Sequence, residues 1–292
     1  MNRYLVILLG LFLSFQASGQ QTPLDSLIDY ILMGDEEAIR LLDSEKDEHF
    51  LYLSTGFSPH TYYAGREIGD NILNISGQAI YLHPKGFYMG VAGGWYQQLQ
   101  PQYNMTMLSV GWSDKLKKSD HLRLRGSFGH YIFTREPSGE KPAPIETINI
   151  GTTLYKKKSG ARLDYTLLAG EGLSHQLSLD LYRKIPVARF GKYSKIAVLP
   201  EISLFMGQEV VEYELTTFTR ARFTTEPVYI SDERFGLLNT RLILPVLVSM
   251  RNFELEASYT YNLPRSLDPL YFYDKTSQWS ISVGYLMGLR KK

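Results

Sequence analysis

A strict alternation of apolar and polar residues over positions 253–262 constrains the fold more than any other feature of the chain. The apolar members are Phe253, Leu255, Ala257, Tyr259 and Tyr261, and the residues between them are Glu254, Glu256, Ser258, Thr260 and Asn262. Successive side chains of a β-strand point to opposite faces, so a period of two predicts a strand with one apolar and one polar face. The apolar face must be covered either by a protein core or by lipid.

The same period of two recurs along most of the chain, and the helical period is absent after Phe50. Twelve segments qualify as strands: 50–58, 72–82, 86–97, 103–113, 121–133, 145–156, 161–169, 174–184, 194–207, 235–250, 252–262 and 277–289. Strands joined by short connections pair antiparallel with their neighbours in the sequence. The sequence therefore predicts an all-β fold, a single antiparallel barrel of about twelve strands over residues 49–292.

The connections between these segments alternate in length. Residues 83–85, 157–160 and 251 are short links, whereas 59–71, 134–144, 208–234 and 263–276 are long. The link at 170–173 is shorter than this rule predicts, and the link after 184 is longer. Short turns at one end and long loops at the other are typical of barrels in outer membranes, and a soluble sandwich has no reason for the asymmetry.

The first nineteen residues have the composition of a secretory signal peptide. Arg3 precedes an apolar run that ends at Phe15, and Ala17 and Gly19 fit the small positions before a cleavage site. The run is too short for a membrane-spanning helix, which needs about 20 residues. The chain contains no cysteine, so it has neither a lipoprotein attachment site nor disulfides.

Residues 20–48 form an acidic segment with nine acidic and two basic side chains. Thr22 and Pro23 predict a helix start, and Leu24, Leu27, Ile28, Ile31 and Leu32 follow at helical spacing. The apolar stripe needs a surface to cover. We expect a short helical segment that docks at the periplasmic mouth, enters the barrel as a plug, or stays a mobile periplasmic helix.

Taken together, residues 1–19 and 50–289 resemble Gram-negative outer-membrane β-barrel proteins as a class, through the export signal, the alternating strands and the unequal loops. The resemblance implies a transmembrane barrel in the cell outer membrane, with outer-membrane lipid and the barrel assembly machinery as partners. Aromatics near strand ends would form interfacial girdles: Tyr52, Tyr81, Trp95, Trp112, Tyr259, Tyr261 and Trp279. The final strand is followed by Arg290, Lys291 and Lys292, which departs from the terminal aromatic common in the class.

The polar faces of several strands carry charges, which the barrel interpretation places in the lumen. These candidate lumen-lining residues are Arg123, Arg125, Arg162, Asp164, Asp180, Arg241, Glu254 and Glu256. Both signs occur, so the set predicts either ion pairs that fill the interior or an aqueous pathway whose charges set selectivity. The leading function is a channel or transport-like barrel for small solutes.

Three alternatives remain at this stage: a barrel lipid hydrolase, a protein whose surface loops 208–234 and 263–276 bind a partner, and a soluble exported β-protein. His175 and Ser178 are the nearest approach to a hydrolase pair, but three residues along a strand place them on opposite faces. The histidines show no metal-ligand spacing, and no phosphate-binding loop is present. We predict no catalytic, cofactor or metal residues, and the near-neutral charge predicts no nucleic-acid partner.

Overall fold

The computed structural model describes residues 49–68, 72–99, 102–116, 119, 121–134, 143–156, 158–191, 194–216 and 227–289. The predicted signal peptide and the predicted acidic helical segment lie outside these residues, as do the three basic residues at the end of the chain. No helix in the described part of the chain is both long enough and apolar enough to cross a membrane.

The described residues form strands that follow the predicted segments closely. They are β1 (His49–Ser58), β2 (Tyr62–Tyr63), β3 (Arg66–Glu67), β4 (Asn74–Leu82), β5 (Phe87–Tyr96), β6 (Tyr103–Lys115), β7 (Leu122–Phe133), β8 (Ile145–Lys156), β9 (Ser159–Ala169), β10 (Leu173–Arg183), β11 (Ile185–Phe190), β12 (Ser194–Val198), β13 (Glu201–Thr216), β14 (Pro227–Met250), β15 (Phe253–Pro264) and β16 (Thr276–Leu289).

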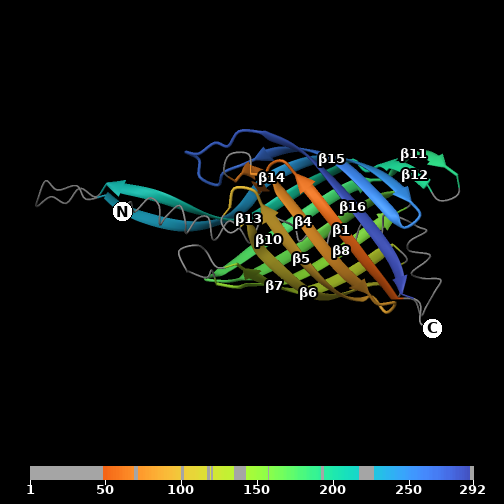
Figure 1. The fold of residues 1–292 in the computed structure, drawn as a ribbon. Helices are drawn as coiled ribbons and strands as arrows, with labels where there is room; N and C mark the ends of the chain where they lie inside the picture. The colour runs from red at the N-terminus through yellow and green to blue at the C-terminus, as the bar shows by residue number, and fades with distance from the viewer. Residues whose placement is uncertain are drawn as a thin grey trace, which may run out of the picture.

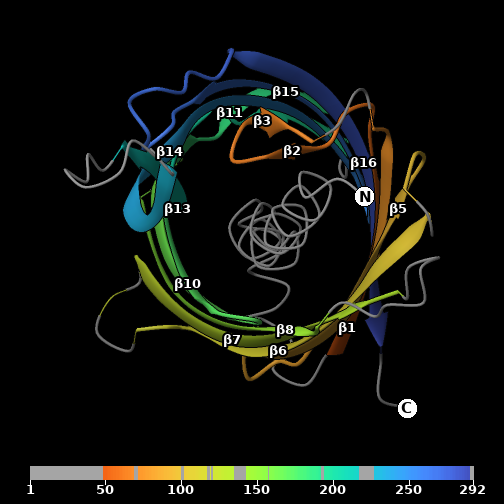
Figure 2. The same cartoon turned by 90° about the vertical axis from the view of Figure 1, so that its left-hand side faces the viewer.

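Twelve of these strands close into one antiparallel barrel (Figures 1 and 2). Each pairs with its neighbour around the ring, and β1 completes the closure by pairing with both β4 and β16. The predicted all-β barrel and its strand number are therefore confirmed. We call the end that carries connections 59–73, 134–144, 217–226 and 265–275 the loop end, and the opposite end, with links such as 251–252, the turn end.

Alternation in the sequence becomes a difference between the two faces of the wall. On β8, Thr147 and Asn149 are buried on the inner face, while Ile148 and Ile150 are exposed on the outer face, Ile150 to 62%. Exposed apolar side chains recur on the outer face of nearly every strand. An outward apolar surface of this extent marks contact with lipid or another apolar surface rather than with water.

Two predicted connections are wrong, because strands continue where links were expected. The predicted loop 208–234 is replaced by extensions of β13 and β14, which pair from Glu201 opposite Ile243 to Thr216 opposite Pro227. The predicted link after 184 contains β11, which forms a hairpin with β12, the beginning of the predicted strand 194–207. Figure 1 shows the first hairpin projecting from the loop end and the second from the turn end.

Candidate functional site

The inner wall from β7 to β14 carries a belt of charged side chains. Arg162 lies directly across from Asp180, Asp180 across from Ser203, and Ser203 across from Arg241. Side chains opposite one another on adjacent strands are within contact distance. The register alone therefore places these four residues, which are distant in the sequence, in one row across the wall.

Arg162 is the centre of this belt. Its guanidinium Nη2 lies 2.7 Å from Asp180 Oδ2, and its Nε donates a hydrogen bond to the same oxygen at 2.8 Å. The same side chain lies 3.6 Å from Asp164 and 3.9 Å from Glu201. Because Asp180 is fully buried, its carboxylate depends on these donors and not on water.

Arg125 and Asp164 form a second ion pair. The two side chains meet across the strand between them, which has a glycine at this position. The two residues sit on β7 and β9, and both lie across from Gly151 on β8. Arg125 Nη2 and Asp164 Oδ1 form an ion pair over this glycine. A Cβ at position 151 would lie 2.0 Å from Asp164 Oδ1, so only glycine leaves room for the contact.

The remaining predicted residues take different positions on the inner face. Arg123 is buried on β7, next to Arg125 along the strand, and Arg241 donates a hydrogen bond to Ser203 Oγ at 2.8 Å. Glu254 and Glu256 are half-buried on β15, on the face opposite to exposed Leu255. Their cross-strand partners are uncharged: Ser249 and Gly284 for Glu254, Leu247 and Ser282 for Glu256.

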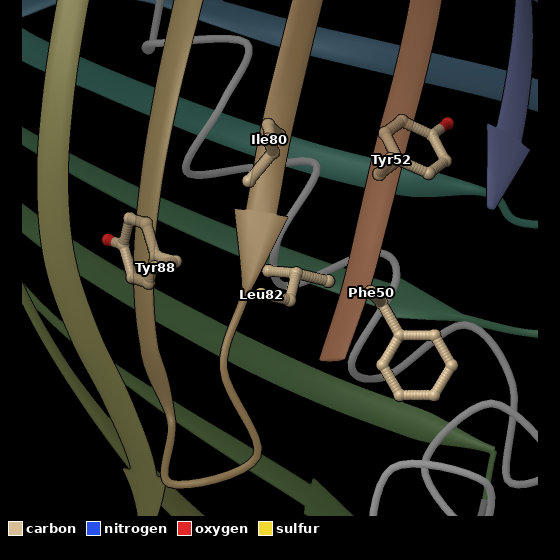
Figure 3. Close-up of a cluster of buried hydrophobic side chains, with 5 residues drawn as sticks. All are labelled: Phe50, Tyr52, Ile80, Leu82 and Tyr88. Atoms are coloured by element: carbon tan, nitrogen blue, oxygen red, sulfur yellow. The ribbon is translucent and has the colours of Figure 1, made fainter. Parts of the chain in front are cut away.

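At the turn end of β1, β4 and β5 the inner wall is apolar, which was not predicted from the sequence. Phe50 and Tyr52 from β1, Ile80 and Leu82 from β4, and Tyr88 from β5 form one buried cluster (Figure 3). Tyr52 therefore belongs to the inner face and not to an interfacial girdle, so that prediction is wrong. Leu51 and Leu53 alternate with Phe50 and Tyr52, so the strand is apolar on both faces and its pattern cannot show which face points inward.

The loop between β1 and β4 folds back into the barrel. Figure 2 shows its small hairpin, β2 and β3, within the ring of strands. Ala64 and Gly65 both have positive φ, 47° and 79°, as a type I′ turn requires. Tyr63 and Ala64 pack against Phe205 and Leu238 of the barrel wall, in a cluster that Leu267 also joins.

Arg66 fixes this hairpin to the wall and to a second loop. Its Nη1 lies 2.8 Å from Glu209 Oε1 of β13, and its Nη2 donates to the carbonyl oxygen of Arg265 at 2.6 Å. Its guanidinium carbon also lies 3.9 Å from the centre of the Tyr273 ring. Burial raises the pKa of Tyr273, with Arg66 acting in the opposite direction, so the phenol stays neutral near pH 7.

Residues 59–71 were predicted from the sequence only as a long loop. A signal was present: a two-residue Ala64-Gly65 turn separates Tyr62-Tyr63 from Arg66-Glu67, the spacing of a tight hairpin. Sequence alone gave no indication that the hairpin points inward. That direction depends on Arg66 meeting Glu209, which is 143 residues away in the chain.

His175 and Ser178 lie on opposite faces of β10, as their spacing predicts. The ring Nδ1 of His175 lies 2.6 Å from the Tyr165 hydroxyl, while Ser178 is buried on the inner face. These two residues do not form a nucleophile and base. Among the described residues, no group of three or more histidine, aspartate or glutamate side chains is placed to hold a metal ion.

No protein-family model matches the chain, and no curated protein matches it in sequence. Solved structures with a similar arrangement include the KdgM porin, at 7% identity and a TM-score of 0.45 over 81% of this chain and 98% of that one. The NanC porin has 9% identity and a TM-score of 0.45 over 80% and 98%. The COG4313 outer membrane channel of Pseudomonas putida F1 has 7% identity and a TM-score of 0.45 over 82% and 96%.

Proposed function

We propose that this chain is an outer-membrane barrel that conducts small polar solutes. The observation that carries the proposal is the division between its two faces: apolar side chains are exposed on the outside, and ionised side chains lie on the inside. Charged groups on the inner face of a membrane barrel line its interior and set which solutes pass. A soluble barrel or sandwich needs the reverse arrangement, with the apolar face inside.

The size of the ring favours small solutes. Eight-stranded barrels are filled by their own side chains, whereas those of about 16–18 strands leave a wide aqueous channel. Twelve strands give an intermediate width, and part of that width at the loop end is taken by the β2–β3 hairpin. The Arg162 belt further favours polar solutes over apolar ones, because its charges lie along one wall.

The location follows from the same proposal. Residues 1–19 direct export, and the barrel inserts in the outer membrane with its apolar outer face in contact with lipid. The loop end then faces the outside of the cell and the turn end the periplasm, as in other barrels of this class. The barrel assembly machinery is the partner that this route implies.

Conductance across a planar lipid bilayer tests the proposal directly. The mature chain, refolded in detergent and added to one side, should produce discrete current steps that are proportional to voltage. The same preparation unfolded by heat is the control. A chain that is folded and inserted but gives no steps would contradict the channel.

Ion selectivity tests whether the inner charges border the pathway. Glu254→Gln removes one negative charge from the inner face, and Glu171→Gln removes one from the exposed turn between β9 and β10. Under a salt gradient, the reversal potential of Glu254→Gln should shift away from cation preference by more than that of Glu171→Gln. Equal shifts would mean that Glu254 is not in contact with the permeating ions.

A further inference from the structure

The loop between β15 and β16 ends in an unusually exposed apolar tip. Leu270, Tyr271 and Phe272 are exposed to 78%, 65% and 91%, and they are consecutive. Single exposed apolar residues are common on any protein, but a contiguous exposed group of this kind marks an interaction surface. The tip carries no charge, whereas Asp268, Asp274 and Lys275 flank it.

The base of this loop is held in place by buried contacts. Asp268 is itself buried, and its Oδ1 accepts a hydrogen bond from the backbone N–H of Leu270 at 2.8 Å. Its carbonyl oxygen accepts another from the N–H of Tyr271 at 3.2 Å. Nearby, the backbone N–H of Leu267 donates to Glu209, the carboxylate that also binds Arg66. The loop thus presents its apolar tip in a defined position.

The tip lies next to the apolar outer face of the barrel. Figure 2 shows the loop running along the outside of the ring, at the rim above β14, β15 and β16. Tyr259 and Trp279 are direct cross-strand partners on the outer face below it, and both are exposed. Phe57 adds a third ring, 5.5 Å from that of Trp279. The strands that carry this loop therefore present a group of aromatic rings on the outer face, on the same side of the ring as the loop.

We propose that Leu270, Tyr271 and Phe272 insert into the interfacial layer of the outer leaflet and anchor this rim of the barrel to lipid. Aromatic side chains favour the boundary between headgroups and acyl chains, where one end of the ring is apolar and the other hydrated. This inference rests on the proposed membrane location of the barrel. It adds that a loop, and not only the strands, contacts lipid.

The anchor has a structural consequence for the interior of the barrel. Tyr273 follows the tip directly, and its ring packs under the Arg66 guanidinium of the inward hairpin. Arg66 also binds the carbonyl oxygen of Arg265 at the start of the same loop. One loop therefore contacts lipid on its outer side and positions the β2–β3 hairpin on its inner side.

Depth-dependent fluorescence quenching tests the anchor. Trp95, Trp112 and Trp279, the three native tryptophans, are first replaced by phenylalanine in the full mature chain. A single tryptophan is then introduced as Phe272→Trp, and the protein is reconstituted in phosphatidylcholine vesicles brominated at shallow or deep acyl positions. Because Phe272 is almost fully exposed, the substitution leaves the internal packing unchanged.

Two matched variants in the same background separate this proposal from the proposed membrane location. Ile150→Trp, on the outer face in mid-strand, reports whether the barrel is inserted. Glu171→Trp, at an exposed turn of the loop end, is the aqueous reference. We expect shallow bromines to quench Phe272→Trp most strongly, deep bromines to quench Ile150→Trp, and neither to quench Glu171→Trp.

Three results would overturn the anchor. Phe272→Trp that is quenched no more than Glu171→Trp, while Ile150→Trp is quenched, would show an inserted barrel whose loop stays in water. A shielded but unquenched Phe272→Trp, together with a dimer in light scattering, would mean that a second copy of the chain covers the tip. No quenching of Ile150→Trp would refute the membrane location and the anchor together.

Discussion

The two halves of the inner wall are lined in different ways. The wall from β7 to β14 carries ion pairs such as Arg162 with Asp180 beside smaller apolar clusters, whereas the turn end of β1, β4 and β5 is lined by Ile80, Tyr88 and their apolar neighbours. Apolar contacts tolerate many packings, but buried charges require a specific partner at a specific distance. We infer that the charged half fixes the strand register and that the apolar half contributes stability with less geometric constraint.

Removing a charge from the belt should have the largest effect. Arg162→Met leaves the fully buried Asp180 without its two Arg162 contacts, and a buried pair broken in this way costs about 3–5 kcal/mol. The free energy of unfolding, measured by urea titration in lipid vesicles, should fall by this amount. Arg189→Met, at an exposed site on β11, is the control and should change little.

The double variant Arg162→Met/Asp180→Leu sharpens the same test. If the pair acts mainly by specifying geometry, replacing both charges with apolar side chains should recover much of the lost stability. A double variant as unstable as Arg162→Met alone would mean that the wider belt, including Asp164 and Glu201, depends on the Arg162 charge itself.

On the apolar half, Ile80→Ala should cost about 2–5 kcal/mol, the range for truncating a fully buried isoleucine. Ile150→Ala is the matched control, because its side chain is on the outer face and its removal leaves no internal cavity. The same urea titration measures both variants. Equal losses would show that the apolar cluster is not packed as a core.

The outer and inner faces themselves can be tested at neighbouring positions of β15. Arginine on the lipid face of a barrel costs about 2–4 kcal/mol at the membrane midplane. Leu255→Arg should therefore reduce the yield of folded, heat-modifiable protein more than Glu254→Arg, which places the charge on the inner face. Equal yields would show that the two faces have been assigned wrongly.

The contrast between the two halves also explains how much of the fold the sequence could predict. Arg162, Asp164 and Asp180 alternate with large apolar residues, so their strands and faces follow directly from the pattern. Phe50 and Tyr52 alternate with Leu51 and Leu53, so a strand is predicted but its inner face is not. Alternation is informative only where the two faces differ in polarity.

The alternation of apolar and polar residues cannot predict contacts between residues that are far apart in the sequence. The inward hairpin is held by the ion pair between Arg66 and Glu209. The sequence around each residue gives no sign that the two side chains meet. The extension of β13 is different, because the pattern was present there: Val211, Tyr213 and Leu215 alternate with Glu212, Glu214 and Thr216, and this stretch was nevertheless predicted as a loop. The sequence could name the charged residues of the belt, but it could not predict which arginine meets which carboxylate.

The smallest predicted effect tests how far geometry controls the charged half. In Gly151→Ala the new Cβ would lie 2.0 Å from Asp164 Oδ1 and 3.0 Å from Arg125 Nη2, so the ion pair must move apart. Overpacking of this kind costs about 1–3 kcal/mol. Gly126→Ala, on the adjacent strand, is the matched control, because a Cβ there meets no atom within 4 Å. Alanine should be neutral or slightly stabilising at 126, since glycine weakens a strand interior. If urea titration shows the same small change for both variants, the Arg125–Asp164 pair tolerates displacement, and the inferred geometric constraint does not apply to it.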